Sequence, residues 1–168
     1  MVMEINVKLS TSDLKRAVRQ LKGLKKSLPE KIEQKNQQLV EEGKTILDTN
    51  IANISDFDGN EKGSTFGTAV DLNATIEWQG DQVQFLEFGT GIVGSHQPYE
   101  GTLPSGWEYG KGKYSGKHED GHWHYSKNGG DLILTYGIPA YAPMLHTSEE
   151  LKTKIPEIYK GLLGGNEE

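Results

Sequence analysis

The chain has 168 residues and a net charge of −6, with 34% hydrophobic residues and 21 glycines. It has no cysteine, which excludes a disulfide framework and thiolate chemistry, and it has no apolar run long enough to cross a bilayer. The length suits one domain over residues 1–168, and so much glycine predicts either a long, poorly packed loop or a core completed by neighbouring copies.

The charge is distributed unevenly along the chain. Residues 1–35 carry nine Lys/Arg and four Asp/Glu, whereas the remaining residues carry nine and twenty. This polarity suits head-to-tail contact between copies, or a basic face turned towards an acidic partner. The simpler interpretation of the basic part alone is a solvated helix face.

The N-terminal third predicts a strand followed by two helices. Residues 5–9 alternate apolar and polar side chains, which favours a short first strand. Residues 10–13 supply N-cap chemistry for a helix whose apolar side chains recur at helical spacing as far as residue 24. Pro29 suits the first turn of a second helix, whose apolar stripe covers residues 32–51. We therefore expect a long helix pair laid on a sheet.

A β-hairpin is predicted next. Residues 56–67 are polar and glycine-rich, which is typical of a loop. Residues 70–78 alternate apolar and polar side chains over nine positions, which indicates a strand with one solvated face. Residues 79–81 then turn the chain into a second strand over residues 83–88, so that the two strands form an antiparallel hairpin.

A glycine-rich turn follows this second strand. Gly89, Gly91 and Gly94 lie within six positions, and glycine allows the backbone to take a positive φ. Glu87 lies between two phenylalanines just before the turn. Because a buried, unpaired carboxylate is costly, we expect Glu87 at a sheet edge or in an interface.

A long loop insertion is predicted over residues 92–121. Loops of this length inside a compact domain are usually functional or disordered. Its aromatic residues are separated by glycines, which leaves two interpretations: a surface that orders on meeting a neighbour, or a flexible insertion. These residues are Tyr99, Trp107, Tyr109 and Tyr114.

A second hairpin and a final helix complete the chain. Residues 122–125 and 131–136 flank the turn-forming residues 128–130 and predict two antiparallel strands. Pro143 suits the first turn of the last helix, whereas Pro156 lies within it and predicts a kink or a break. The expected fold class is α+β, with a mostly antiparallel sheet of four or five strands packed against the N-terminal helix pair and the C-terminal helix.

Two short motifs, in the order in which they occur, resemble those of a known family. They are Phe85-Leu-Glu-Phe-Gly-Thr-Gly91 and Gly137-Ile-Pro-Ala-Tyr-Ala-Pro-Met-Leu145. The family consists of tailed-bacteriophage and prophage proteins described as tail-component, tail-completion or head–tail joining (neck) proteins. The first motif is similar to that family's strand ending in Glu-aromatic-Gly-Thr. The second is similar to its Gly-x-Pro-Ala-x-Pro-Phe-hydrophobic entry to the last helix, although here the second proline comes one residue late and Met144 replaces the usual aromatic residue. The long insertion also departs from the compact family pattern.

The resemblance implies a structural virion protein and not an enzyme. Such a protein belongs to the neck or head–tail connector, or completes the upper end of the tail, as a six-fold or alternatively twelve-fold ring around the DNA channel. Its implied partners are its own copies, the connector or stopper proteins of the neck, and the tail terminator or tail tube. DNA would pass through the lumen without sequence-specific contact. The implied location is the head–tail junction of the virion, reached from the host cytoplasm during assembly, with no membrane and no cofactor.

Candidate site residues follow from the motifs and from the aromatic loop. The candidates for subunit contacts are Glu87, Phe88, Gly89, Thr90, Gly91, Trp107, Tyr109 and Tyr114. Pro139, Ala140 and Pro143 are expected to form the entry to the final helix.

The alternative is a zinc-dependent hydrolase built on the histidines. A possible set of zinc ligands consists of His118, His122 and His124, with His96 and Asp120 nearby. Two of these histidines are two positions apart and would project from the same face of a strand. Nucleophilic catalysis has little support, because the chain has no cysteine and no Gly-x-Ser-x-Gly motif, and no phosphate-binding loop is present.

Overall fold

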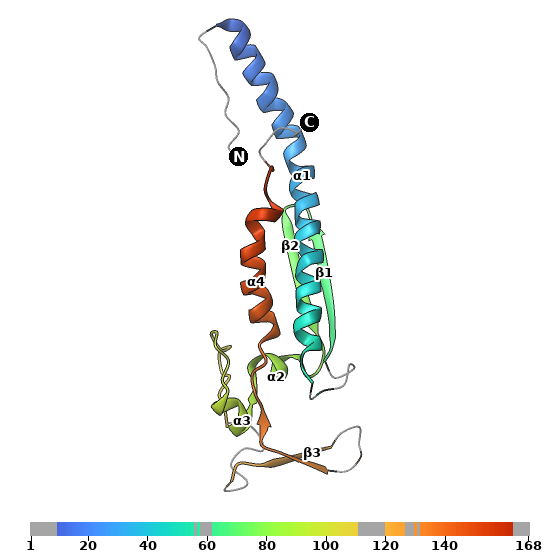
Figure 1. Cartoon of the computed structure of the whole chain (residues 1–168), viewed down its shortest axis with the longest axis vertical. Coiled ribbons are helices and arrows are strands. Elements are labelled where there is room, and N and C mark those ends of the chain that lie inside the picture. The colour runs from blue at the N-terminus through green and yellow to red at the C-terminus, as the bar shows by residue number, and fades with distance from the viewer. Residues whose placement is uncertain are drawn as a thin grey trace. The chain divides into compact units, whose positions relative to one another are not determined.

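The computed structural model describes residues 10–55, 57, 62–110, 120–126, 130 and 132–162 (Figure 1). The first strand predicted, over residues 5–9, lies outside these residues, as do Tyr114 and His118. The elements in chain order are α1 (Thr11–Ala52), β1 (Ser64–Val70), β2 (Asn73–Gln79), α2 (Val83–Phe88), α3 (Gly91–His96), β3 (Trp123–Ser126), β4 (Leu132–Thr135), β5 (Gly137–Ile138) and α4 (Pro143–Ile158).

The N-terminus of α1 is capped as the sequence predicts. The Ser10 hydroxyl accepts a hydrogen bond from the backbone N–H of Asp13 (3.2 Å) and donates one to its carboxylate (2.6 Å). The backbone N–H of Leu14 donates to the Ser10 carbonyl (3.1 Å), which closes the first helical turn. A serine in this position satisfies N–H groups that have no partner within the helix.

The predicted helix pair is wrong, because α1 is one continuous helix of 42 residues with Pro29 inside it. A proline in a helix lacks the N–H that would bond to the carbonyl four residues earlier. Pro29 and Lys25, whose carbonyl loses that bond, are both exposed, so water is available to the carbonyl. The apolar residues Leu24, Leu28 and Ile32 also keep helical spacing across the proline. One continuous helix therefore places the apolar side chains before and after Pro29 on the same face.

The first hairpin lies earlier in the chain than predicted. The alternating run over residues 70–78 is not one strand, because the chain turns at Asp71 and Leu72, between β1 and β2. Asp71 has φ of 53°, a left-handed conformation that Asp tolerates better than most residues. The strand β1 therefore begins within the segment predicted as loop, and it pairs with β2 in a two-stranded sheet.

The predicted strand over residues 83–88 is also wrong, because these residues form the short helix α2. Phe85 and Phe88 both contact the ring of Trp107, with centroids 6.0 and 5.3 Å apart. Side chains three positions apart share one side of a helix but point to opposite faces of a strand. The helix therefore allows both phenylalanines to pack on one tryptophan, while Leu86 is fully buried.

The second hairpin is confirmed. Strands β3 and β4 are antiparallel, with Trp123 opposite Thr135 and Ser126 opposite Leu132. The predicted sheet of four or five strands is nevertheless wrong. The strands described form two separate two-stranded sheets, and β5 makes only isolated bridges, from Ile138 to Thr90 and from Gly137 to Gly91. The fold is mainly helical, because α1 has 42 residues and α4 has 16, and residues 83–88 form a helix in place of the predicted strand.

The final helix begins at Pro143, as predicted. Its missing N–H costs nothing there, because the first N–H groups of a helix have no partner within it. Pro156 lies inside α4, and the helix ends at Ile158, so the break predicted at Pro156 itself does not occur.

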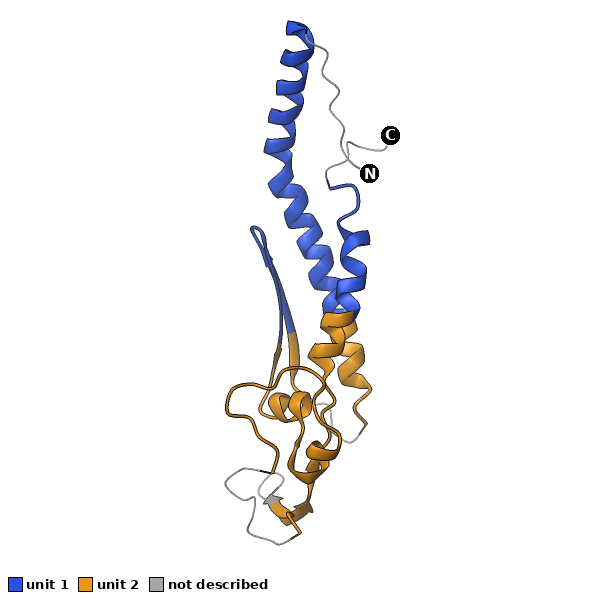
Figure 2. Ribbon diagram, turned by 90° about the vertical axis from the view of Figure 1, so that its left-hand side faces the viewer, with its two compact units in different colours: residues 1–45, 66–77, 150–168 blue, residues 46–65, 78–149 orange. Residues whose placement is uncertain are grey.

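The chain divides into two compact units, which Figure 2 shows in different colours. Unit 1 contains residues 1–45, 66–77 and 150–168, and unit 2 contains residues 46–65 and 78–149. In unit 1, a Cβ placed on Gly43 would lie 2.2 Å from Ile76 Cδ1 and 2.8 Å from Leu151 Cδ1. The absence of a side chain at Gly43 therefore brings α1, β2 and α4 together.

Polar side chains reinforce this contact within unit 1. Lys154 of α4 forms an ion pair and a hydrogen bond with Glu42 of α1. Tyr159 donates its hydroxyl hydrogen bond to the side-chain oxygen of Asn36, which is buried. The C-terminal part of α4 is therefore fixed to the middle of α1 by both packing and polar contacts.

The apolar core of unit 2 lies around the end of α1. Leu47 and Leu86 are fully buried, and Ile54 and Trp78 are nearly so. The indole N–H of Trp78 donates to the backbone carbonyl of Lys62 (2.6 Å). Within the residues that the structure describes, no helix is both long and apolar enough to span a membrane.

Candidate functional site

The two motifs noted in the sequence contact each other directly in unit 2. We call this contact the junction, and define it as residues 86–91 together with residues 137–145. The backbone N–H groups of Tyr141 and Ala142 donate to the carbonyls of Leu86 (3.0 Å) and Glu87 (3.3 Å). More than forty residues of chain separate the two segments, so tertiary structure alone brings them together.

Glu87 caps the final helix from across the junction. One carboxylate oxygen accepts the backbone N–H of Met144 (2.9 Å), and the other accepts that of Leu145 (3.1 Å). These are N–H groups of the first turn of α4, which needs an outside acceptor. Ala142, the residue before the helix, has no side-chain oxygen to serve as its N-cap, so a carboxylate from α2 takes that place. A negative charge at a helix N-terminus is also favoured by the helix dipole.

Burial sets the protonation behaviour of Glu87. Only 5% of the residue is exposed. Desolvation raises the pKa of the carboxyl above its ordinary value, while the hydrogen bonds from Met144, Leu145 and Tyr99 and the nearby His146 lower it. The desolvation is the larger effect. The same contact raises the pKa of the Tyr99 hydroxyl through its burial and its closeness to Glu87.

Glycines allow the two backbones of the junction to touch. Gly89 has φ of 72°, and a Cβ there would lie 2.6 Å from the Ala140 nitrogen and 2.9 Å from the Pro139 carbonyl carbon. Gly137 has φ of 103°, and a Cβ there would lie 2.0 Å from the Thr90 carbonyl oxygen. Backbone atoms cannot move aside as the end of a side chain can. Both positions therefore need glycine for the conformation and for the space.

The first part of the predicted loop packs on the junction. Tyr109 donates its hydroxyl to the Phe88 carbonyl (2.7 Å) and accepts the backbone N–H of Tyr99 (2.8 Å). The ring of Tyr99 packs edge to face on Phe88, with centroids 5.0 Å apart. Residues 91–96 form α3, so this part of the predicted loop is also helical. The residues up to 110 therefore contact the junction of their own chain, and both interpretations of the loop stay predictions.

The candidates for subunit contacts thus fall into different places. Glu87 and Gly89 are buried within unit 2, and Phe88, Trp107 and Tyr109 are half-buried in the aromatic cluster. Their role in a subunit contact stays a prediction, as does that of Thr90 and Gly91, which are also half-buried. Tyr114 lies outside the described residues. Pro139, Ala140 and Pro143 lie in the junction, and Pro143 opens α4 as expected.

Of the candidate histidines, His122 and His124 lie at the start of the second hairpin, His96 ends α3, and His118 lies outside the described residues. His122 Nδ1 is paired with the Asp120 carboxylate, and Tyr136 donates to the same carboxylate (3.3 Å). The His122 hydrogen bond lowers the pKa of Asp120. The rings of His122 and His124 are in edge contact, with centroids 5.4 Å apart. In the part of the chain that the structure describes, no three His, Cys, Asp or Glu side chains are placed to bind one metal ion.

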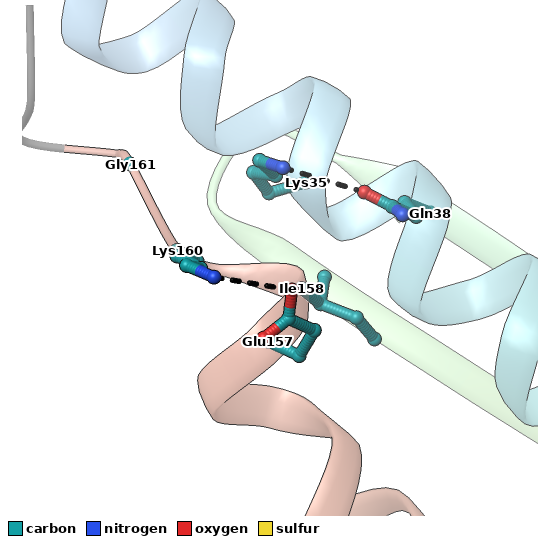
Figure 3. Close-up of a pocket in the computed structure, with 6 residues that line it drawn as sticks. All are labelled: Lys35, Gln38, Glu157, Ile158, Lys160 and Gly161. Atoms are coloured by element: carbon teal, nitrogen blue, oxygen red, sulfur yellow. Dashed lines mark hydrogen bonds and ion pairs between the residues drawn. The ribbon is translucent and has the colours of Figure 1, made fainter.

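An open cavity of about 440 Å³ lies in unit 1, between α1 and the end of α4 (Figure 3). Its charged side chains interact with near neighbours in the chain. Lys35 donates to Gln38 (3.5 Å), and Lys160 lies 3.7 Å from Glu157. A specific ligand site needs polar groups that point to one place, and the polar side chains that line this cavity do not do so.

In comparisons with known proteins, no protein-family model, no curated protein and no solved structure matches this chain. Its function must therefore be inferred from its own residues and geometry.

Proposed function

We propose that this chain is a structural subunit of a tailed bacteriophage that joins head to tail, either in the neck or at the upper end of the tail. It assembles as a ring around the DNA channel, with six-fold symmetry or alternatively twelve-fold symmetry. It works by shape and charge, without catalytic turnover.

The junction is the observation that carries this proposal. The resemblance to phage neck and tail-completion proteins rests on two short motifs, each of which is weak alone. In the structure, Glu87 of one motif caps the helix that the other motif opens, and Gly89 and Gly137 allow their backbones to touch. The two motifs that carry the resemblance therefore form one physical unit in this chain.

A ring of this kind requires unlike faces on each subunit. In a heterologous interface, one face of a copy meets a different face of the next, and the rotation closes into a ring. The basic N-terminal segment and the acidic remainder supply faces of opposite charge. Acidic residues facing the lumen would let DNA slide past, because they do not bind its phosphates. The expected neighbours are the connector or stopper proteins of the neck and the tail terminator or tail tube.

Native mass spectrometry of the untagged protein, alone and mixed with neighbouring neck proteins, tests this proposal. We expect a complex of six or twelve copies of the 18.6 kDa chain, free of bound zinc. A monomer in both conditions would contradict the ring. One tightly bound zinc per chain would favour the zinc hydrolase, although no three described side chains are placed to bind one metal ion.

A further inference from the structure

The N-terminal part of α1 exposes a row of apolar side chains. Leu14, Val18 and Leu21 are 51%, 48% and 51% exposed, and their spacing of four and three places them on one side of the helix. Basic residues surround this row. Residues 11–28 contain six Lys/Arg and one acid, Asp13, which pairs with Arg16 at 3.3 Å. We call the surface formed by Leu14, Val18 and Leu21 and the six Lys/Arg of residues 11–28 the basic stripe. Exposed apolar rows of this kind commonly mark interaction surfaces.

The outer face of the β1–β2 hairpin is also apolar, but its charge is opposite. Residues along β1 alternate between exposed and half-buried, and the exposed set includes Phe66 (47%) and Val70 (62%). Leu72 in the turn is 63% exposed. Residues 64–79 contain Asp71 and Glu77, both exposed, and no Lys/Arg. We call this the acidic hairpin face.

We infer that the basic stripe of one copy docks on the acidic hairpin face of the next copy. The inference rests on the proposed ring, for which it names the subunit interface. Each surface has three exposed apolar side chains beside charges of one sign, and the two signs are opposite. Burying the apolar side chains against each other stabilises the contact, while the charges select the unlike face and steer the encounter. Because the two surfaces differ, the contact is heterologous and propagates from copy to copy.

Other occupants fit these surfaces less well. A symmetric pair of basic stripes would place lysines against lysines, which is unfavourable at close range. A lipid surface would suit a basic amphipathic helix, but residues 11–28 contain no aromatic residue of the kind that anchors such helices. Neither occupant explains the apolar face of the hairpin. A second copy of the chain covers both surfaces in a single interaction.

Disulfide trapping between two single-cysteine variants tests the inference. The chain has no cysteine of its own, so each variant carries one thiol. We would mix Val18→Cys protein with Val70→Cys protein that carries a mass tag, and oxidise the full-length chains in a glutathione buffer. A cross-link requires the two Cβ atoms to come within about 4.5 Å. The expected result is a mixed dimer at least about tenfold more abundant than in the control mixture.

The control mixture pairs Val18→Cys with Ser105→Cys, because Ser105 is exposed in unit 2 and belongs to neither surface. A second pair, Leu21→Cys with Leu72→Cys, is measured in parallel in case either first variant fails to fold. Equal cross-linking to Ser105→Cys, or self-linked Val18→Cys as the main product, would overturn the inference. Val18-dependent binding to anionic vesicles without a mixed dimer would also overturn it.

The outcomes separate the interface from the ring. Closed rings that assemble without the mixed dimer would refute this interface and leave the proposed function standing. A mixed dimer in chains that form open filaments would support the interface and refute the ring.

Discussion

Glu87 connects two segments that are distant in the chain, and the stability of the junction depends on its two carboxylate oxygens. Each oxygen accepts one backbone N–H of α4. The substitution Glu87→Gln replaces one acceptor with an NH₂ group that faces another N–H. We expect the free energy of unfolding to fall by about 1–3 kcal/mol, which is the usual cost of an unsatisfied buried polar group. Chemical denaturation measures this change.

The matched control is Glu100→Gln, the same change at an exposed carboxyl of the same unit. It should alter stability by less than about 0.5 kcal/mol, as surface substitutions usually do. Equal effects from the two substitutions would show that the cap contributes nothing.

The pH dependence has a defined sign. Burial raises the pKa of Glu87 above 4.5, so the folded chain holds the proton more tightly than the unfolded chain. The stability contributed by protonated Glu87 is complete below about pH 4.5 and is lost as the pH rises through the raised pKa. As the pH rises from about 4.5 through the raised pKa of Glu87, the wild-type protein should therefore lose stability relative to Glu87→Gln. A relative gain with rising pH would contradict the effect of burial. Tyr99 and His146 are the other titratable groups close to this carboxyl.

At the scale of elements, Gly43 holds α1 close to β2 and α4. The substitution Gly43→Gln places a long side chain against Ile76 and Leu151, in a space where even a Cβ is too close. We expect a loss of about 1–3 kcal/mol, because overpacking distorts a close-packed interior. Thermal unfolding followed by circular dichroism measures it.

Gly23→Gln is the control, because Gly23 lies in the same helix and has nothing within 4 Å of its Cβ position. Glutamine forms helix better than glycine, so this variant should gain up to about 1 kcal/mol. A loss of stability at both positions would mean that close packing is not the reason for glycine at position 43.

The sequence predicted elements where local signals decide the structure. The cap at Ser10, the second hairpin and the start of α4 at Pro143 are all set by residues within a few positions, and the structure confirms them. The prediction that a second helix starts at Pro29 is wrong, and the apolar spacing through Leu28 continues across the proline. That spacing was a signal in the sequence that favours one helix.

Other elements are decided by distant residues. Residues 83–88 have a composition suited to a strand, yet they form a helix because Trp107 packs on Phe85 and Phe88. The role of Glu87 as a cap likewise depends on α4, more than fifty residues away. No local pattern contains these contacts. The motifs lie in these two segments, but only the structure shows that the segments touch and why Gly89 and Gly137 are glycines.

At the scale of the whole molecule, the proposed assembly would complete a chain with a lean composition and exposed apolar faces. The two-stranded sheets are small, and apolar residues remain exposed on α1, on the first hairpin and on β4. A two-stranded hairpin alone is marginally stable in water, so contacts with further copies would contribute to its stability. The proposed assembly into a ring would cover these surfaces.

Electron microscopy of the purified chain with its neighbouring neck proteins tests this claim most directly. The account predicts closed rings of six or twelve subunits with a central channel wide enough for duplex DNA. Isolated particles of single chains, in the presence and absence of those partners, would contradict it.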